Sequence, residues 1–246
     1  EYATFRTTYY RWEKNIEIPI LVYHNIVDDE DEIKYDYMQT TQENFEKQMK
    51  GLIKLGYHFI SYEDLLKYNN GEKALFKKSC IVTFDDGFKG VYENAYPIAK
   101  KYDIPITTFI INKNVGQKDT LSWEQLKEME ESKLVEVGSH SWDHADFRNL
   151  TKEEAVENVE RSYQEIEEKL GKTFNKRIFT YPYGLYRPEQ IEELKERGYI
   201  QNLTDNKINE SKNLNLNGLH REYPLNDSVI KMIIKIQYRK IRYGNT

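Results

Sequence analysis

Two adjacent carboxylates, Asp85 and Asp86, follow an apolar run and precede Gly87. The run from Cys80 to Phe84 is rich in β-branched and aromatic residues, which predicts a buried strand. Glycine permits the sharp turn that would end this strand. Two acids held side by side repel each other, so a metal ion, a proton or a basic partner must offset their charge. The alternative interpretation of this segment alone is a solvated Asp-Gly turn.

A second group with spacing suited to chemistry is His140 and His144, which follow a predicted strand over residues 134–139. On a helical turn the two imidazoles would share one face and could bind a metal ion together. A carboxylate from another strand end would complete a set that suits zinc, cobalt, nickel or iron. No fourth protein ligand is evident, which favours a site with positions open to water and substrate. Two hydrogen-bonded, inert histidines are the alternative.

The elements that would position these residues are strands that alternate with helices. Four predicted strands end in polar or aromatic residues, at His24, at Asp85 and Asp86, at His140, and at Tyr183 and Gly184. The carboxyl ends of parallel strands meet at one edge, where sites form in α/β folds. Strand–helix alternation predicts a parallel sheet, open or closed into a barrel.

Helix boundaries are marked by capping residues and glycines. Ser or Thr at 41, 61, 122 and 151 predicts helix starts, glycines at 56, 171 and 198 predict helix ends, and Asn226 is expected to cap a last helix. A helix is also expected from about residue 92 to 102. No linker or repeat divides the chain, so we expect an amino-terminal arm over residues 1–15 and a single domain over residues 16–246.

Composition narrows the class of protein. The 246 residues include 41 acids and 36 bases, a formal charge of −5, which disfavours a nucleic-acid surface. The one cysteine, Cys80, excludes an intrachain disulfide framework. No run is long enough to cross a membrane. The chain begins with Glu1, and a removed signal or anchor would explain this start. We therefore expect an extracellular or cell-surface location.

Three segments taken in order carry a family resemblance. The segments 83–87 (Thr-Phe-Asp-Asp-Gly), 140–144 (His-Ser-Trp-Asp-His) and 181–184 (Tyr-Pro-Tyr-Gly) resemble the motifs of the polysaccharide deacetylases with a NodB-type domain, carbohydrate esterase family 4. The resemblance implies a distorted (β/α) barrel of about seven strands, extending over residues 18–225. It also implies a hydrolase that removes acetyl groups from N-acetylated sugars with one divalent metal ion, most simply zinc.

The resemblance assigns roles to individual residues. It makes Asp85 the catalytic base and Asp86, His140 and His144 the metal ligands. The peptide N–H of Tyr183 becomes an oxyanion donor. The implied reaction is metal-assisted amide hydrolysis, in which the ion polarises the acetyl carbonyl and activates a water molecule.

Two positions depart from the family pattern. Many members carry arginine where this chain has Thr180, and Arg221, after another predicted strand, is the candidate substitute. Many members also keep the histidine acid in a late motif, which His220 matches poorly. His24 resembles the early histidine of biofilm poly-N-acetylglucosamine deacetylases, and the strand before it is stronger. We therefore favour His24 as the general acid and poly-N-acetylglucosamine as the substrate, with peptidoglycan and chitin oligomers as alternatives.

Aromatic residues flank the motifs and are candidates to stack on sugar rings. They are Phe88, Trp142, Tyr181 and Tyr186. Two other functions remain open from the sequence. One is a non-catalytic, polysaccharide-binding member of the family. The other is a non-haem iron oxygenase, because two histidines and a carboxylate also describe its site.

Overall fold

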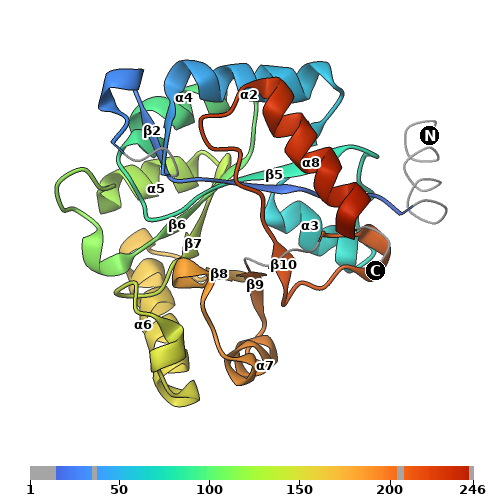
Figure 1. The fold of residues 1–246 in the computed structure, drawn as a ribbon. Helices are drawn as coiled ribbons and strands as arrows, with labels where there is room; N and C mark the ends of the chain where they lie inside the picture. The colour runs from blue at the N-terminus through green and yellow to red at the C-terminus, as the bar shows by residue number, and fades with distance from the viewer. Residues whose placement is uncertain (1–14, 35–37, 204–207, 244–246) are drawn as a thin grey trace.

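The computed structural model describes residues 15–34, 38–203 and 208–243. A parallel sheet curves into a barrel with helices outside it (Figure 1). Its strands, in spatial order, are β1 (Ile20–Tyr23), β5 (Ser79–Phe84), β6 (Ile106–Ile110), β7 (Val135–Ser139), β8 (Arg177–Thr180), β9 (Tyr199–Leu203) and β10 (Leu219–His220). The predicted α/β barrel of about seven strands is confirmed.

The barrel is nearly closed where its first and last strands meet. Just after β10, Glu222 forms a parallel bridge with Leu21 of β1. The N–H of Val22 donates to Glu222 O at 2.7 Å, and the N–H of Glu222 donates to Ile20 O at 2.7 Å. This contact places the residues that follow β1 beside those that follow β10, although about 200 residues separate them in the chain.

Helices follow most of the strands and cover the outside of the barrel. They are α2 (Gln42–Lys54), α3 (Tyr62–Asn69), α4 (Tyr96–Tyr102), α5 (Trp123–Glu131), α6 (Lys152–Leu170), α7 (Pro188–Glu196) and α8 (Val229–Tyr243). The capping boxes at Ser61, Ser122 and Thr151 and the Thr41 cap form as predicted. Each supplies a side-chain acceptor to an otherwise unpaired N–H of the first turn.

The helix expected from about residue 92 to 102 forms with these bounds, and its first part, Val91–Ala95, is π-helical before α4. One capping prediction was wrong. Asn226 does not cap α8. Its side-chain oxygen accepts from the Thr41 N–H at 3.3 Å and from Asn44 at 2.9 Å, so it fixes the start of α2 instead. The predicted arm over residues 1–15 lies, except for Asn15, outside the described residues.

Three short strands lie off the main order. The strands β2 (Asn25–Val27) and β3 (Gln39–Thr41) pair in parallel with each other. The two-residue strand β4 (His58–Phe59) pairs with the beginning of β5.

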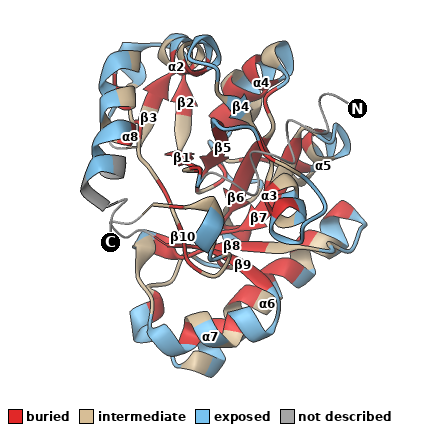
Figure 2. Ribbon diagram, turned by 90° about the vertical axis from the view of Figure 1, so that its right-hand side faces the viewer, coloured by how far each residue is buried: buried red, intermediate tan, exposed pale blue. Residues whose placement is uncertain are grey.

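Side chains alternate between the barrel interior and the helix layer. Ile20, Ile81 and Ile178 belong to the interior cluster, whereas Leu21 and Val82 pack toward the outer helices. Buried residues follow the strands, and exposed ones cover the outer helix faces (Figure 2). The interior is tight, because a Cβ at Gly138 would lie 2.6 Å from the Phe109 ring. Only glycine fits at that point.

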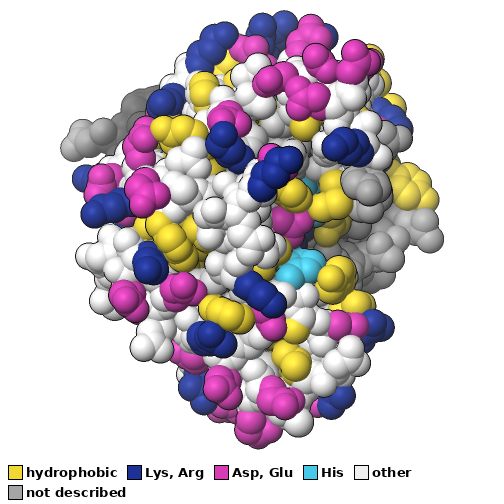
Figure 3. Space-filling view, turned by 90° about the vertical axis from the view of Figure 1, so that its left-hand side faces the viewer, with side chains coloured by type: hydrophobic (Ala, Val, Ile, Leu, Met, Phe, Trp, Pro, Cys, Tyr) yellow, Lys and Arg dark blue, Asp and Glu magenta, His cyan; other side chains and the backbone are white. Residues whose placement is uncertain are grey.

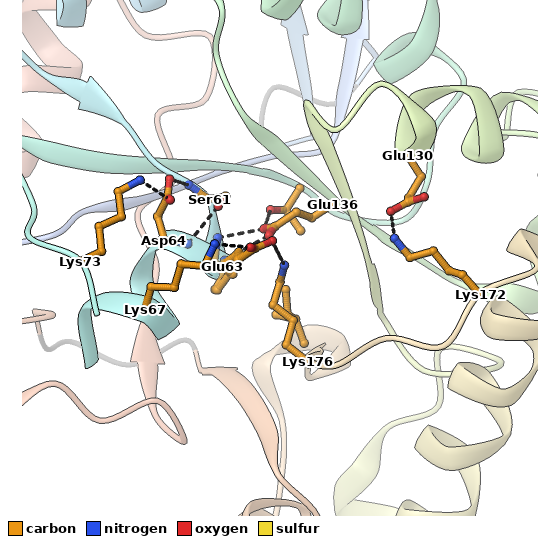
Figure 4. A network of polar contacts seen from close by, with 12 residues as sticks. Ser61, Glu63, Asp64, Lys67, Lys73, Glu130, Glu136, Lys172 and Lys176 are labelled. Carbon is orange, nitrogen blue, oxygen red and sulfur yellow. Dashed lines mark hydrogen bonds and ion pairs between the residues drawn. The ribbon is translucent and has the colours of Figure 1, made fainter. Parts of the chain in front are cut away.

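An ionic network fixes the amino end of the barrel (Figure 4). Glu136 of β7 accepts from the peptide N–H groups of Tyr62 and Glu63, at 2.9 and 3.1 Å. Its carboxylate also pairs with Lys176 at 2.5 Å. A carboxylate at a helix amino terminus satisfies unpaired N–H groups and favours the helix dipole. This end of the barrel therefore has a structural role, and the opposite edge is free to hold a site.

Candidate active site

The predicted site residues converge at the carboxyl edge of the strands. His24 follows β1, Asp85 and Asp86 follow β5, His140 follows β7, Tyr183 follows β8 and Arg221 follows β10. Figure 3 faces this edge and shows histidine and acidic side chains in a recess of the surface. The convergence follows from the topology, because every strand of the barrel is parallel to its neighbours.

The Asp86, His140 and His144 side chains form one cluster. The Nε2 atoms of His140 and His144 lie 3.4 and 3.5 Å from Oδ1 of Asp86, and the three ligand atoms all lie within 4.8 Å of one another. Two ligands bonded to zinc at about 2.1 Å with a tetrahedral angle lie about 3.4 Å apart. The spacing therefore fits a divalent ion bound by these three residues, with further positions open.

Hydrogen bonding sets the tautomer of His140. Its Nδ1 lies 2.9 Å from the carbonyl oxygen of Thr180, which can only accept, so Nδ1 carries the proton and Nε2 presents a lone pair. Burial lowers the pKa of His140 to about 3 and also lowers the pKa of His144. Both imidazoles are therefore neutral at pH 7, which is the form that binds a metal ion.

The two adjacent acids differ in their ionisation. Burial and the neighbouring Asp85 charge raise the pKa of Asp86 to about 7. For Asp85, burial opposes ionisation, but the Arg221 guanidinium outweighs it and lowers the pKa of Asp85 to about 2. A cation at Asp86 would remove the cause of its raised pKa, since it would offset the repulsion between the two carboxylates.

Asp85 is held by Arg221 through two parallel hydrogen bonds. The two terminal guanidinium nitrogens donate to the two carboxylate oxygens, each at 2.8 Å. Both side chains are buried. This fork is the geometry in which arginine binds a carboxylate most rigidly. Thr180, at the position where many relatives carry arginine, contributes its carbonyl to His140. Arg221, which follows β10, is thus the guanidinium partner of Asp85.

Strand alternation separates the two candidate acids. Ile20 faces the barrel interior and Leu21 faces the helices, so His24 shares the inward side with Ile20. Leu219 and Arg221 face inward, which turns the intervening His220 outward. Asp85 and Arg221 both act on the pKa of His24, which burial lowers below its ordinary value. His24 therefore lies on the same inward side as Asp85 and Arg221, whereas His220 lies on the other side of its strand.

Comparison with known proteins places this site in a family. The family model for polysaccharide deacetylases matches residues 72–201, more than half of the chain. The chain belongs to the polysaccharide deacetylase family. The matched region contains all three motifs. Together with the barrel, it confirms the resemblance to NodB-type members of carbohydrate esterase family 4.

Individual relatives of this deacetylase are moderately similar in sequence. It is 34% identical over 170 residues to a poly-β-1,6-N-acetyl-D-glucosamine N-deacetylase of Staphylococcus aureus, a match that covers 64% of this chain and 58% of that protein. It is 29% identical over 209 residues to YxkH of Bacillus subtilis, named as a polysaccharide deacetylase, covering 85% and 72% of the two chains.

Solved structures of deacetylases share its fold. The Streptococcus pyogenes deacetylase PplD, in complex with acetate, is 25% identical, with a TM-score of 0.79 and coverage of 90% of this chain and 99% of that one. IcaB from Ammonifex degensii is 28% identical, with a TM-score of 0.77 and coverage of 90% and 97%.

In the deacetylase, Tyr183 takes a left-handed conformation, with φ 59° and ψ 3°. In the turn that it forms, the N–H groups of Gly184 and Leu185 donate to Tyr181 O and Pro182 O. The Tyr183 side chain is 65% exposed, and its ring centre lies 4.4 Å from that of His144. The Tyr183 side chain therefore lies beside the cluster.

Left-handed backbone is concentrated around the site. Asp86, Ser141, His144 and Tyr183 all have φ between 59° and 70°. A non-glycine residue in this conformation costs free energy, so it persists only where the surrounding structure imposes it. Their concentration at one edge indicates loops that are built to aim particular side chains.

The four aromatic candidates do not share one environment. Tyr181 is 1% exposed, and its hydroxyl donates to Gln201 at 2.7 Å. It packs in the core with Phe147 and Phe179, so its assignment to sugar contact was wrong. Alternation along the chain explains the error, because Tyr181 continues the outward face of β8.

The other three aromatic candidates are partly exposed. The Trp142 indole donates to Glu165 at 3.0 Å, and the guanidinium of Arg161 lies 3.4 Å from its ring centre. Tyr186 lies against Tyr181, with ring centres 5.1 Å apart. Phe88 lines a cavity of about 750 Å³ beside β2.

A buried polar chain that the sequence analysis missed supports the histidine loop. Ser139 and Ser162 share a hydrogen bond of 2.6 Å, and Ser162 donates to Asn112 at 2.6 Å. Ser139 accepts from the Ser141 N–H, and Ser141 accepts in turn from the His144 N–H, at 2.8 Å. A serine in the middle of α6 has no sequence signal for this role.

Proposed function

We propose that this deacetylase removes N-acetyl groups from poly-β-1,6-N-acetylglucosamine at the cell surface, with a divalent metal ion as cofactor. The observation that carries the catalytic part is the joint arrangement of Asp86, His140 and His144 beside an ionised Asp85 that is held by Arg221. The substrate rests on the 34% identity to the Staphylococcus aureus enzyme of that name.

The ion belongs at Asp86, His140 and His144, where it would polarise the acetyl carbonyl and make a bound water molecule more acidic. We place zinc there first, since two imidazoles and a carboxylate suit it, with cobalt, nickel or iron as alternatives. His140 keeps its lone pair directed at Asp86 because Thr180 fixes its other nitrogen.

Asp85 is the general base of the proposal. It is ionised throughout the neutral range, because the paired Arg221 guanidinium outweighs burial. Arg221 also fixes the carboxylate in one orientation, so it acts as a positioning residue. From this place Asp85 takes the proton of the attacking water molecule.

Tyr183 and His24 serve the later steps. The Tyr183 N–H donates to the oxyanion of the tetrahedral intermediate, a contribution of about 3–4 kcal/mol for a well-placed donor. His24 delivers a proton to the departing amine, a contribution of about 10²–10⁴ in rate. Because burial lowers its pKa, His24 is neutral at rest. Before it acts, it takes up the proton that Asp85 accepted from the water molecule, which returns Asp85 to its ionised form.

Acetate release from β-1,6-linked N-acetylglucosamine oligomers tests this function. We expect release by the zinc-loaded protein, loss of release with a chelator, and recovery on addition of zinc or cobalt. Peptidoglycan and chitin oligomers are the comparison substrates, and faster release from either would overturn the substrate assignment. Absence of release from every glycan with every metal would support a non-catalytic binding protein. The iron oxygenase alternative gains no support from family membership, and anaerobic turnover would exclude it.

A further inference from the structure

The C-terminal helix α8 presents a row of large apolar side chains to the outside. Ile230, Ile234, Tyr238 and Ile241 are 73, 60, 54 and 77% exposed. They recur at intervals of four, four and three residues, so they fall on one face of the helix. Figure 2 shows α8 along the outer edge of the molecule, with exposed residues on its outward side. A continuous apolar row of this kind marks an interaction surface, unlike exposed residues scattered singly.

The opposite face of α8 is firmly docked, so the exposed row is not a core face that has come loose. Met232 and Ile236 are buried in the main core. Near the start of the helix, a Cβ at Gly51 of α2 would lie 2.3 Å from Val229, so the two helices touch closely. Buried Gln48 donates to the Asp227 carbonyl at 2.7 Å and holds the preceding turn. The helix therefore buries one apolar face and leaves a second one outside.

The charge of α8 contrasts with that of the rest of the chain. Its fifteen residues include five lysines and arginines and no acid, whereas the whole chain carries a formal charge of −5. Asp227, just before the helix, pairs with Lys231 and Lys235 and offsets one of these charges. An apolar face together with basic residues is typical of helices that lie in the plane of an anionic membrane surface.

We propose that α8 attaches this protein to an anionic lipid surface. The exposed row would enter the headgroup and acyl boundary, and the net positive charge of the helix sequence would favour an anionic surface. Two copies of α8 would bring their positive charges together, which disfavours self-association through this face. Among the described residues, every helix falls short of the length and apolar character that a membrane span requires. The attachment is independent of the proposed function, because α8 contributes no residue to the candidate active site.

Vesicle co-sedimentation tests the proposal on the whole chain. The probes are vesicles of phosphatidylcholine alone and of phosphatidylcholine with phosphatidylglycerol in equal parts. We expect binding to the second and much weaker binding to the first, with binding reduced by added salt. The double variant Ile234→Gln/Ile241→Gln should bind at least about tenfold more weakly, because it removes two apolar contacts. Phe76→Gln is the matched control, since Phe76 is 51% exposed outside α8, and it should bind like the unchanged protein.

Several results would overturn the attachment. They are failure of the unchanged protein to bind anionic vesicles, equal binding by the double variant, or equal loss in the Phe76 control. Light scattering provides a separate check, because a dimer that the double variant dissociates would show that the row binds a second copy. Acetate release from soluble oligomers should be the same in all variants. If the unchanged protein released no acetate, the proposed function would be wrong, whereas the measured binding to anionic vesicles would still hold.

Discussion

Metal binding to this protein should release a proton from Asp86. Burial and the Asp85 charge raise the pKa of Asp86 to about 7 in the metal-free protein, and a metal ion binds only the ionised carboxylate. Burial keeps His140 and His144 neutral, so the two histidines add little to the release. With a pKa of about 7, binding releases about 0.9 proton at pH 6 and about 0.1 at pH 8. Below pH 7 the apparent affinity should fall about tenfold per pH unit, or about 1.4 kcal/mol.

Isothermal titration calorimetry measures this release, through binding enthalpies compared in two buffers with different ionisation enthalpies. Ionisation of a water molecule on zinc adds protons with the opposite trend, more at pH 8 than at pH 6, so the direction of the trend is diagnostic. Asp85→Asn is the matched variant, because it removes one of the two causes of the raised pKa of Asp86. It should release fewer protons on metal binding at pH 6 than the unchanged protein does. Equal release at pH 6 and pH 8, or no change in this variant, would refute the reasoning.

Three further predictions concern the groups around the ion. Arg221→Met should abolish acetate release and lower the free energy of unfolding by about 3–5 kcal/mol at pH 7, because it leaves a buried charge on Asp85 unpaired. This loss of stability should shrink as the pH falls and Asp85 takes up a proton. An equal loss at pH 4 and pH 7, measured by urea unfolding, would contradict the pairing of Asp85 with Arg221. His24→Ala should lower kcat by about 10²–10⁴, whereas His220→Ala should stay near the unchanged rate; the reverse result would exchange their roles. Ser162→Ala should weaken metal binding by roughly tenfold, because the hydrogen bonds that orient the histidine loop are lost, and unchanged affinity by titration would make Ser162 structural only.

The two faces of α8 allow a fifth prediction, on the stability of the protein. Its exposed row contributes nothing to the core, so Ile234→Gln should leave the midpoint of urea unfolding nearly unchanged. Met232→Gln on the docked face should lower it clearly, because a polar group would be buried without a partner. If the two variants unfolded alike, the assignment of the two faces would be wrong.

Local features of the sequence were sufficient for several elements. The capping boxes at Ser61, Ser122 and Thr151 form as predicted, because a cap depends on residues three positions apart. The strand before Asp85 was also predictable from its continuous apolar run, which is typical of a strand buried on both faces. Asn226 shows the limit, because its partners in α2 lie about 180 residues away.

For the site, the sequence by itself determined which residues could bind a metal ion and which strand ends would present them. Residue type and spacing indicated His140, His144 and a carboxylate from another strand end, and the family resemblance selected Asp86 as that carboxylate. Only the tertiary structure decided the partner of Asp85 and which of His24 and His220 faces that pair. Closure of the barrel brings Arg221 beside the first strand, and alternation along each strand turns one histidine inward and the other outward. These outcomes depend on which strands become neighbours and in which register, a property of the folded chain that no short segment contains.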